Sequence, residues 1–216
     1  MHTFRDLATA AYCPRKLYYR RQDPPEETPD AVATRRDLAF AYERLLTDDE
    51  FLLESPIAAT PTTYRSRLAC AKASLDRWGE LADPPARDVF LSGADCRGIA
   101  HKVLDDPPVP SLCFGGDPPE RGVWEPQRVH AVAAAKALAW ERETPVESCF
   151  VEYPAHGVVR RVNLTTGNKA AYRDALGVAA GMAGPPPRLR DDARCAPCEY
   201  RETCGVRTES LRSRLG

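Results

Sequence analysis

Three cysteines are gathered near the end of the chain, in the segment Cys195-Ala-Pro-Cys198-Glu-Tyr-Arg-Glu-Thr-Cys204. Two residues separate the first pair and five separate the second pair, so all three thiolates can turn toward one centre. Iron–sulfur clusters are bound by soft thiolate ligands, usually four of them. The segment supplies three, so a fourth ligand must come from elsewhere in the chain.

Cys13 is the best candidate for the fourth ligand. It lies in Tyr12-Cys13-Pro14-Arg15-Lys16, where one element ends and a side chain can project. Structural zinc sites commonly pair two C-x2-C units, and the sequence holds no second unit. We therefore expect a cluster, while zinc, or cysteines that bind no metal, stay open as alternatives. A cluster on these four residues would close a loop of about 180 residues and constrain the unfolded chain.

The other four cysteines have different surroundings. Cys70, Cys113 and Cys149 lie in apolar segments, and we expect them to be small buried side chains. Cys96 follows Asp95 in a predicted turn. Eight cysteines without an export signal favour reduced thiols and metal binding over a disulfide framework.

The apolar spacing between the two ends predicts a mixed order of elements. Helical patterns cover residues 3–19, 31–46, 127–142 and about 166–182, with Thr3 as an N-cap. Strand patterns cover residues 88–92, 98–104, 110–114, 148–153 and 158–164. This order favours a mixed α/β fold. We expect one domain over 1–216, in which residues 185–216 form a cysteine knuckle that packs on the N-terminal helix around Cys13.

Composition sets limits on the class of protein. Hydrophobic residues make up 43% and charged residues 28%, which is ordinary for a soluble globular protein. The sequence has no apolar stretch of about 18 residues and no secretory signal, so we expect a cytoplasmic protein without a membrane span. The net charge of −1 gives no overall argument for nucleic-acid binding.

A local basic group follows Cys13. Its members are Arg15, Lys16, Arg20 and Arg21, and two tyrosines lie among them. Cations bind phosphates, and aromatic rings stack on unpaired bases, so this group is a candidate nucleic-acid-binding site. A solvated helix end with two core tyrosines is the alternative.

Both ends of the chain resemble one family. Phe4-Arg5-Asp6-Leu7 and the segment from Tyr12 to Tyr19 resemble the opening of the CRISPR-associated RecB-like exonucleases. The end is similar too: a hairpin with Tyr153, a helix, a proline linker and C-x2-C-x5-C. The resemblance covers about the first 20 and the last 75 residues, and the middle fits by its order of elements.

The resemblance implies a fold, a cofactor and partners. The family belongs to the PD-(D/E)XK superfamily and has a restriction-endonuclease-like mixed sheet flanked by helices. Its members hold a 4Fe-4S cluster on one early and three late cysteines, which implies Cys13 with Cys195, Cys198 and Cys204. They digest DNA from ends with a divalent metal, and they prepare CRISPR spacers together with integrase proteins.

The family's nuclease residues are not matched here. Tyr42 stands where the early helix should carry a histidine, and His101 stands where a strand should carry aspartate. Cys113 and Gly115 replace the Glu-x-Lys pair that should follow. We expect His101 to be a hydrogen-bonded core residue. The site is therefore interpreted as degenerate, with no catalytic residue assigned.

The sequence leaves three hypotheses about function open. The first is an iron–sulfur protein that binds DNA ends, single strands or CRISPR integrase proteins after losing nuclease activity. The second is an active Mg- or Mn-dependent exonuclease with relocated carboxylates, using Asp105 or Asp106. The third is a scaffold or redox-sensing module that does not bind DNA.

Overall fold

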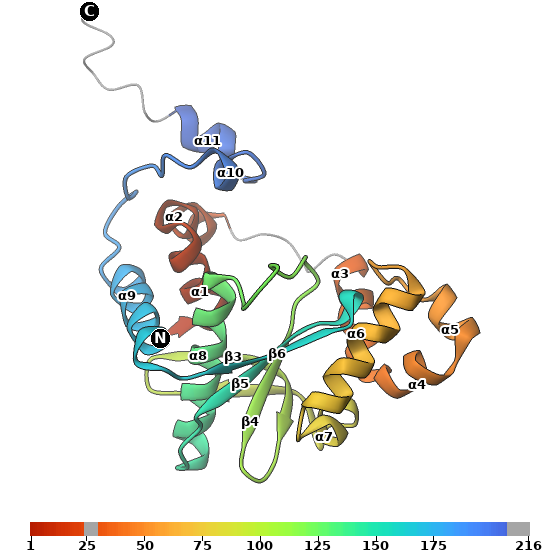
Figure 1. The fold of residues 1–216 in the computed structure, drawn as a ribbon. Coiled ribbons are helices and arrows are strands. Elements are labelled where there is room, and N and C mark those ends of the chain that lie inside the picture. The colour runs from red at the N-terminus through yellow and green to blue at the C-terminus, as the bar shows by residue number, and fades with distance from the viewer. Residues whose placement is uncertain (24–29, 207–216) are drawn as a thin grey trace, which may run out of the picture.

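A mixed six-stranded β-sheet forms the centre of the protein (Figure 1), whose computed structural model describes residues 1–23 and 30–206. The strands are β1 (His2–Thr3), β2 (Ala86–Ser92), β3 (Cys96–Leu104), β4 (Val109–Cys113), β5 (Ser148–Tyr153) and β6 (Val158–Asn163). Their order is β1-β3-β4-β5-β6, and β2 pairs with β3. The β1–β3 and β4–β5 pairs are parallel and the others are antiparallel. The predicted strands and the mixed α/β class are confirmed.

Three helices cover one face of the sheet: α1 (Phe4–Tyr12), α8 (Glu125–Arg142) and α9 (Thr166–Ala180). Leu7 of α1, Leu138 of α8 and Val151 of β5 are fully buried in one hydrophobic cluster. Buried alanines on α8, including Ala133 to Ala135, allow this helix to approach its neighbours closely. Burial of such apolar area is the main stabilising contribution to the fold.

A second group of helices packs on the other face, beside β4 to β6. It comprises α3 (Asp30–Asp37), a 3-10 turn (Leu38–Phe40), α4 (Tyr42–Thr47), α5 (Asp49–Glu54), α6 (Pro61–Ser74) and α7 (Trp78–Ala82). The prediction of one continuous helix over 31–46 is wrong. Helix α3 ends at Asp37, a 3-10 turn follows at Leu38–Phe40, and the carbonyl of Ala39 in this turn accepts a hydrogen bond from the Lys102 ammonium at 2.8 Å.

The predicted N-terminal helix is also divided in two. Thr3 caps α1 through a reciprocal bond with Asp6, which confirms the N-cap. A new helix, α2 (Pro14–Gln22), begins after Cys13. Pro14 disfavours helical dihedrals at the preceding residue, and Cys13 is extended, with φ −162° and ψ 111°. The break therefore leaves Cys13 at a corner between two helices.

The C-terminal segment returns to this corner after α9. It contains α10 (Asp192–Cys195) and α11 (Arg201–Val206), which lie beside α2 in Figure 1. The Tyr12 hydroxyl donates to the carbonyl of Arg194 at 3.1 Å, and the Arg194 guanidinium donates to the carbonyl of Tyr12 at 2.9 Å. The last part of the predicted knuckle, residues 207–216, lies outside the described residues. In the described part of the chain, no helix combines the length and the apolarity that a membrane span requires.

Candidate metal centre and the adjoining groove

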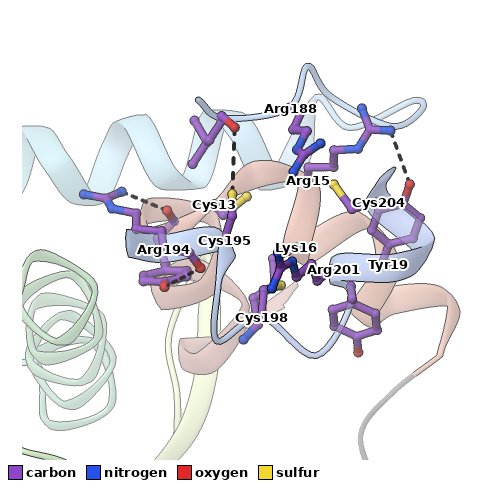
Figure 2. A pocket seen from close by; sticks show the side chains of 13 residues that line it. Cys13, Arg15, Lys16, Tyr19, Arg188, Arg194, Cys195, Cys198, Arg201 and Cys204 are labelled. Carbon is purple, nitrogen blue, oxygen red and sulfur yellow. Dashed lines mark hydrogen bonds between the residues drawn. The ribbon is translucent and has the colours of Figure 1, made fainter. Parts of the chain in front are cut away.

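The four cysteines of the predicted cluster line one cavity (Figure 2). Cys13 reaches it from the corner between α1 and α2, and the other three reach it from the C-terminal segment. All four are partly buried free thiols. Cys195 ends α10, where its thiol donates a long contact of 3.8 Å to the carbonyl of Leu189. The chain thus brings together sulfurs that are separated by up to 191 positions in the sequence.

The thiols surround the cavity without meeting at one point. Within residues 1–23 and 30–206, no three His, Cys, Asp or Glu side chains converge closely enough to hold a single metal ion. A zinc ion and an iron–sulfur cluster both use thiolate ligands, so the four cysteines fit either group by their chemistry.

Cations dominate the rest of the cavity lining. They are Arg15, Lys16, Arg188, Arg194 and Arg201, and Figure 2 shows them around the cysteines. Opposite charges attract strongly at short range where solvent is partly excluded. The lining of the cavity is therefore suited electrostatically to a negatively charged group.

Arg15 has a donor that lacks an acceptor. Its side chain is buried, and its terminal nitrogens donate to the carbonyl of Pro186 at 3.1 Å and to the hydroxyl of Tyr19 at 3.3 Å. The Nε atom is also buried but has no hydrogen-bond partner among the described residues. Buried donors without partners are costly and uncommon. An anionic group bound in the cavity could accept a hydrogen bond from the Arg15 Nε atom.

Aromatic contacts hold the C-terminal segment beside the cavity. The rings of Tyr19 and Tyr200 stack with centroids 5.9 Å apart. The Tyr200 hydroxyl donates to the carbonyl of Asp23 at 2.9 Å. Together with the Tyr12–Arg194 bonds, these contacts position the segment independently of any bound group.

A groove of about 460 Å³ adjoins the cavity. Tyr12 and Lys16 line both, so the groove and the cavity share a wall. We call it the cationic groove because its charged lining includes Arg5, Lys16 and Arg20, while its floor includes His101, Cys113, Phe114 and Gly115.

The four basic residues predicted to bind nucleic acid therefore lie in four different places. Arg20 lines the cationic groove, where it donates to the Thr9 hydroxyl at 3.0 Å. Lys16 lies on the shared wall, and Arg15 lines only the cysteine cavity. Arg21 points elsewhere and donates to the carbonyl of Ala179 at 2.9 Å. Arg5, which the sequence prediction omitted, lines the groove instead.

His101 and Cys113 on the groove floor are uncharged. The Nδ1 atom of His101 accepts the backbone N–H of Cys113 at 3.0 Å, which confirms the predicted hydrogen-bonded histidine. Burial lowers the pKa of His101 to about 4 and raises the pKa of the Cys113 thiol. Both side chains are neutral near pH 7.

The strand that carries His101 is irregular at this residue. The β2–β3 ladder skips the Asp88–His101 pair, and Asp88 has a left-handed backbone with φ 47°. Ala100 and Val103 both pack in the core beneath α1 and α8, although they lie three residues apart. Alternation along β3 is thus broken at His101, although the register is the same on both sides, since Arg87 pairs with Lys102 and Val89 pairs with Ala100.

Carboxylates are scarce in the groove. Among its described lining residues only Glu199 is acidic, and its Oε2 atom lies 3.3 Å from the Nζ atom of Lys16. Asp105 and Asp106 are exposed in the turn between β3 and β4, outside the groove lining. The described lining therefore presents no pair of carboxylates.

A fully buried charge pair, Lys102 and Glu152, lies in the sheet and is absent from the sequence prediction. Lys102 Nζ donates to Glu152 Oε2 at 2.8 Å, and both side chains have 0% exposure. Lys102 also donates to the carbonyls of Ala39 and Leu81, at 2.8 and 2.6 Å. Tyr42, which stands where the family has histidine, donates to Glu152 at 2.7 Å. This Glu152 carboxylate is saturated by protein donors and is closed to solvent cations.

A signal for that pair is present in the sequence. Lys102 precedes Val103-Leu104, and Glu152 follows Cys149-Phe150-Val151, so each charge interrupts an apolar strand. Charged residues are almost never fully buried unless they are paired. The presence of one buried cation and one buried anion in apolar strands therefore indicates that Lys102 and Glu152 pair with each other.

The remaining cysteines are mostly as predicted. Cys113 and Cys149 are buried, which confirms those two predictions. The prediction for Cys70 is wrong, because α6 turns Leu68 and Ala71 to the core and leaves Cys70 exposed. Cys96 opens β3 and is buried, with its sulfur 3.5 Å from the Tyr172 hydroxyl.

Comparisons with known proteins add little. No family model and no curated protein matches the sequence. A solved structure described as "Crystal structure of SSO0001" aligns over 90% of this chain and 92% of that chain, with 10% identity and a TM-score of 0.35. A likeness at this level decides neither the fold family nor the function.

Proposed function

We propose that this chain is an iron–sulfur protein that binds single-stranded DNA or DNA ends, with a RecB-like nuclease fold whose cutting site has been lost. One observation carries the proposal. Four cysteines from opposite ends of the chain line one cavity, and that cavity shares a wall with a cationic groove. The role in CRISPR spacer acquisition beside integrase proteins, and the RecB-like assignment, rest on the resemblance of the two ends and on the order of elements.

The donor set of the cavity supports a 4Fe-4S cluster. Cys13, Cys195, Cys198 and Cys204 would hold it, since thiolates are the ligands such clusters use. The cationic lining and the unpartnered Arg15 Nε suit a group that carries negative charge. When bound, the cluster would supply a cross-link between the two ends of the chain.

The groove supports binding better than cutting. Magnesium and manganese need carboxylate oxygens, and the one carboxylate in the described lining is paired with Lys16. His101 is neutral, and Glu152 is enclosed by Lys102 and Tyr42. Arg5, Lys16 and Arg20 remain to contact phosphates, and the partly buried rings of Tyr12 and Phe114 belong to the same lining.

A binding experiment tests this proposal. Protein purified without oxygen is titrated against a fluorescein-labelled single-stranded 15-mer, and fluorescence anisotropy is followed at several salt concentrations. Arg5→Gln/Arg20→Gln should weaken binding about tenfold and lower the salt dependence by about two charges. The matched control is Arg142→Gln/Arg173→Gln, which removes two exposed arginines outside the groove lining. Absence of binding, or equal affinities in the two double variants, would contradict the proposal.

A further inference from the structure

Glu199 links the cysteine segment to the cationic groove. It follows Cys198 directly, and its carboxylate lines the groove rather than the cavity. Its Oε2 atom lies 3.3 Å from Lys16 Nζ, across 183 positions of sequence. The segment that carries three cluster ligands thus also places a negative charge at one end of the groove.

The two side chains of this ion pair differ in how much of their surface is exposed to solvent. The Lys16 side chain is 22% exposed and the Glu199 side chain is 52% exposed. The ammonium of Lys16 also lies over the ring of Tyr12, 5.7 Å from its centroid. Lys16 is therefore held on the wall, whereas Glu199 can turn to solvent without unpacking a core. The half-buried setting also screens the pair less than a fully solvated pair would be screened.

A phosphate and Glu199 would compete for the same cation. A DNA backbone gains affinity by placing phosphates on lysine and arginine side chains. The Lys16 ammonium is already neutralised, and the Glu199 carboxylate would repel a phosphate that entered from this side. The other groove cations, Arg5 and Arg20, have no carboxylate partner within 4.0 Å among the described residues. The competition is thus confined to the end of the groove beside the cluster cavity.

We propose that Glu199 is an autoinhibitory residue that limits phosphate binding at Lys16, so that the cysteine segment regulates the groove. This inference rests on the proposed nucleic-acid-binding function and deepens it. A phosphate of a DNA strand can bind the Lys16 ammonium only after Glu199 is displaced, either by the strand itself or by a protein that contacts the segment. The position of Glu199 depends in turn on the neighbouring ligand Cys198, so the order of the cluster segment and the affinity of the groove are coupled.

The test is a double-mutant cycle on the full chain loaded with iron, read by anisotropy with the labelled single-stranded 15-mer. Glu199→Gln should tighten binding roughly fivefold at low salt, which is the upper range for one partly exposed ion pair. Glu202→Gln is the matched control, because it removes the same charge from the same segment but from an exposed residue outside the groove lining. It should change affinity by less than about twofold.

The second arm of the cycle isolates Lys16. In a Lys16→Gln background, Glu199→Gln should lose most of its gain, since no cation is left for Glu199 to block. Iron content and visible absorption are measured for every variant, so that a damaged segment is recognised. Equal gains from Glu199→Gln and Glu202→Gln, or a gain that persists without Lys16, would overturn the autoinhibitory role while leaving DNA binding in place. Failure of both wild type and Glu199→Gln to bind would overturn the proposed function and this inference together.

Discussion

Lys102 and Glu152 form a hydrogen-bonded ion pair of 2.8 Å with no exposure to solvent, and the pair joins the sheet to the second group of helices. The Lys102 ammonium also holds the carbonyls of Ala39 and Leu81, which belong to that group. Each charge is therefore satisfied by several partners, as burial of ions demands. Removal of one partner would leave the other charge buried and unpaired.

Lys102→Met should accordingly lower the free energy of unfolding by about 3–5 kcal/mol. The double variant Lys102→Met/Glu152→Gln should recover part of this loss, because no isolated charge remains. Urea denaturation followed by circular dichroism measures both. Lys136→Met, at an exposed position on α8, is the control and should change stability by less than about 0.5 kcal/mol. A loss of less than 1 kcal/mol in Lys102→Met would mean that the pair is not enclosed as described.

Two histidines that line the groove, His101 and His130, predict that the folded state loses stability at acidic pH. Burial lowers the pKa of His101 to about 4 and the pKa of His130 to about 3. Both are neutral in the folded protein and become protonated in the unfolded chain below about pH 6.5. The unfolded state then binds more protons, so stability rises with pH across this window and falls as pH drops from about 6.5 toward 4.

His101→Gln/His130→Gln should flatten that slope, even if it lowers stability overall. Urea midpoints at intervals from pH 7 to pH 5 test this, because most carboxylates stay ionised in that range. A variant whose slope equals that of the wild-type protein would show that neither histidine has a lowered pKa.

The cysteine cavity predicts which thiols control iron binding. Protein prepared without oxygen should absorb near 400 nm and contain about four irons per chain. Cys13→Ala or Cys198→Ala should lose most of the iron and the absorption. Cys70→Ala should keep both, because Cys70 is exposed on α6 and lies outside the cavity lining. Colourless protein with about one zinc per chain would refute the cluster and favour the zinc alternative.

The sequence predicted the strands and the grouping of the four cysteines, but not the contact between charged residues on different strands. The proline after Cys13 and the spacing of the last three cysteines were enough to select the four thiols that line one cavity. Apolar alternation located β3 and β5, but it could not show that Lys102 and Glu152 lie together across β4. That contact depends on the parallel pairing of β4 and β5, which follows from the packing of α8 and not from local spacing.

Nearness in sequence also does not predict which basic residues line the groove. The basic residues after Cys13 were grouped because they are close in sequence, yet helical geometry directs successive side chains to different sides. Arg15 and Arg21 therefore lie outside the groove lining, whereas Arg5, on the preceding helix, belongs to it. Glu199, the acidic neighbour of Lys16, comes from the far end of the chain, and only the docking of the two ends brings it there.

The last prediction concerns cutting. If the carboxylates were relocated, Asp105 and Asp106 would be the nearest exposed pair on the strands concerned, but they occupy a turn outside the groove lining. Hydrolysis of DNA by bound divalent metal requires the carboxylates and the scissile phosphate at one place. We therefore expect single-stranded DNA that is incubated with the protein and about millimolar manganese to stay intact on a denaturing gel. Asp105→Ala/Asp106→Ala should behave like the wild-type protein, and DNA binding should persist in both. Digestion by wild-type protein that disappears in this variant would restore the active nuclease, because contamination would be equal in the two preparations.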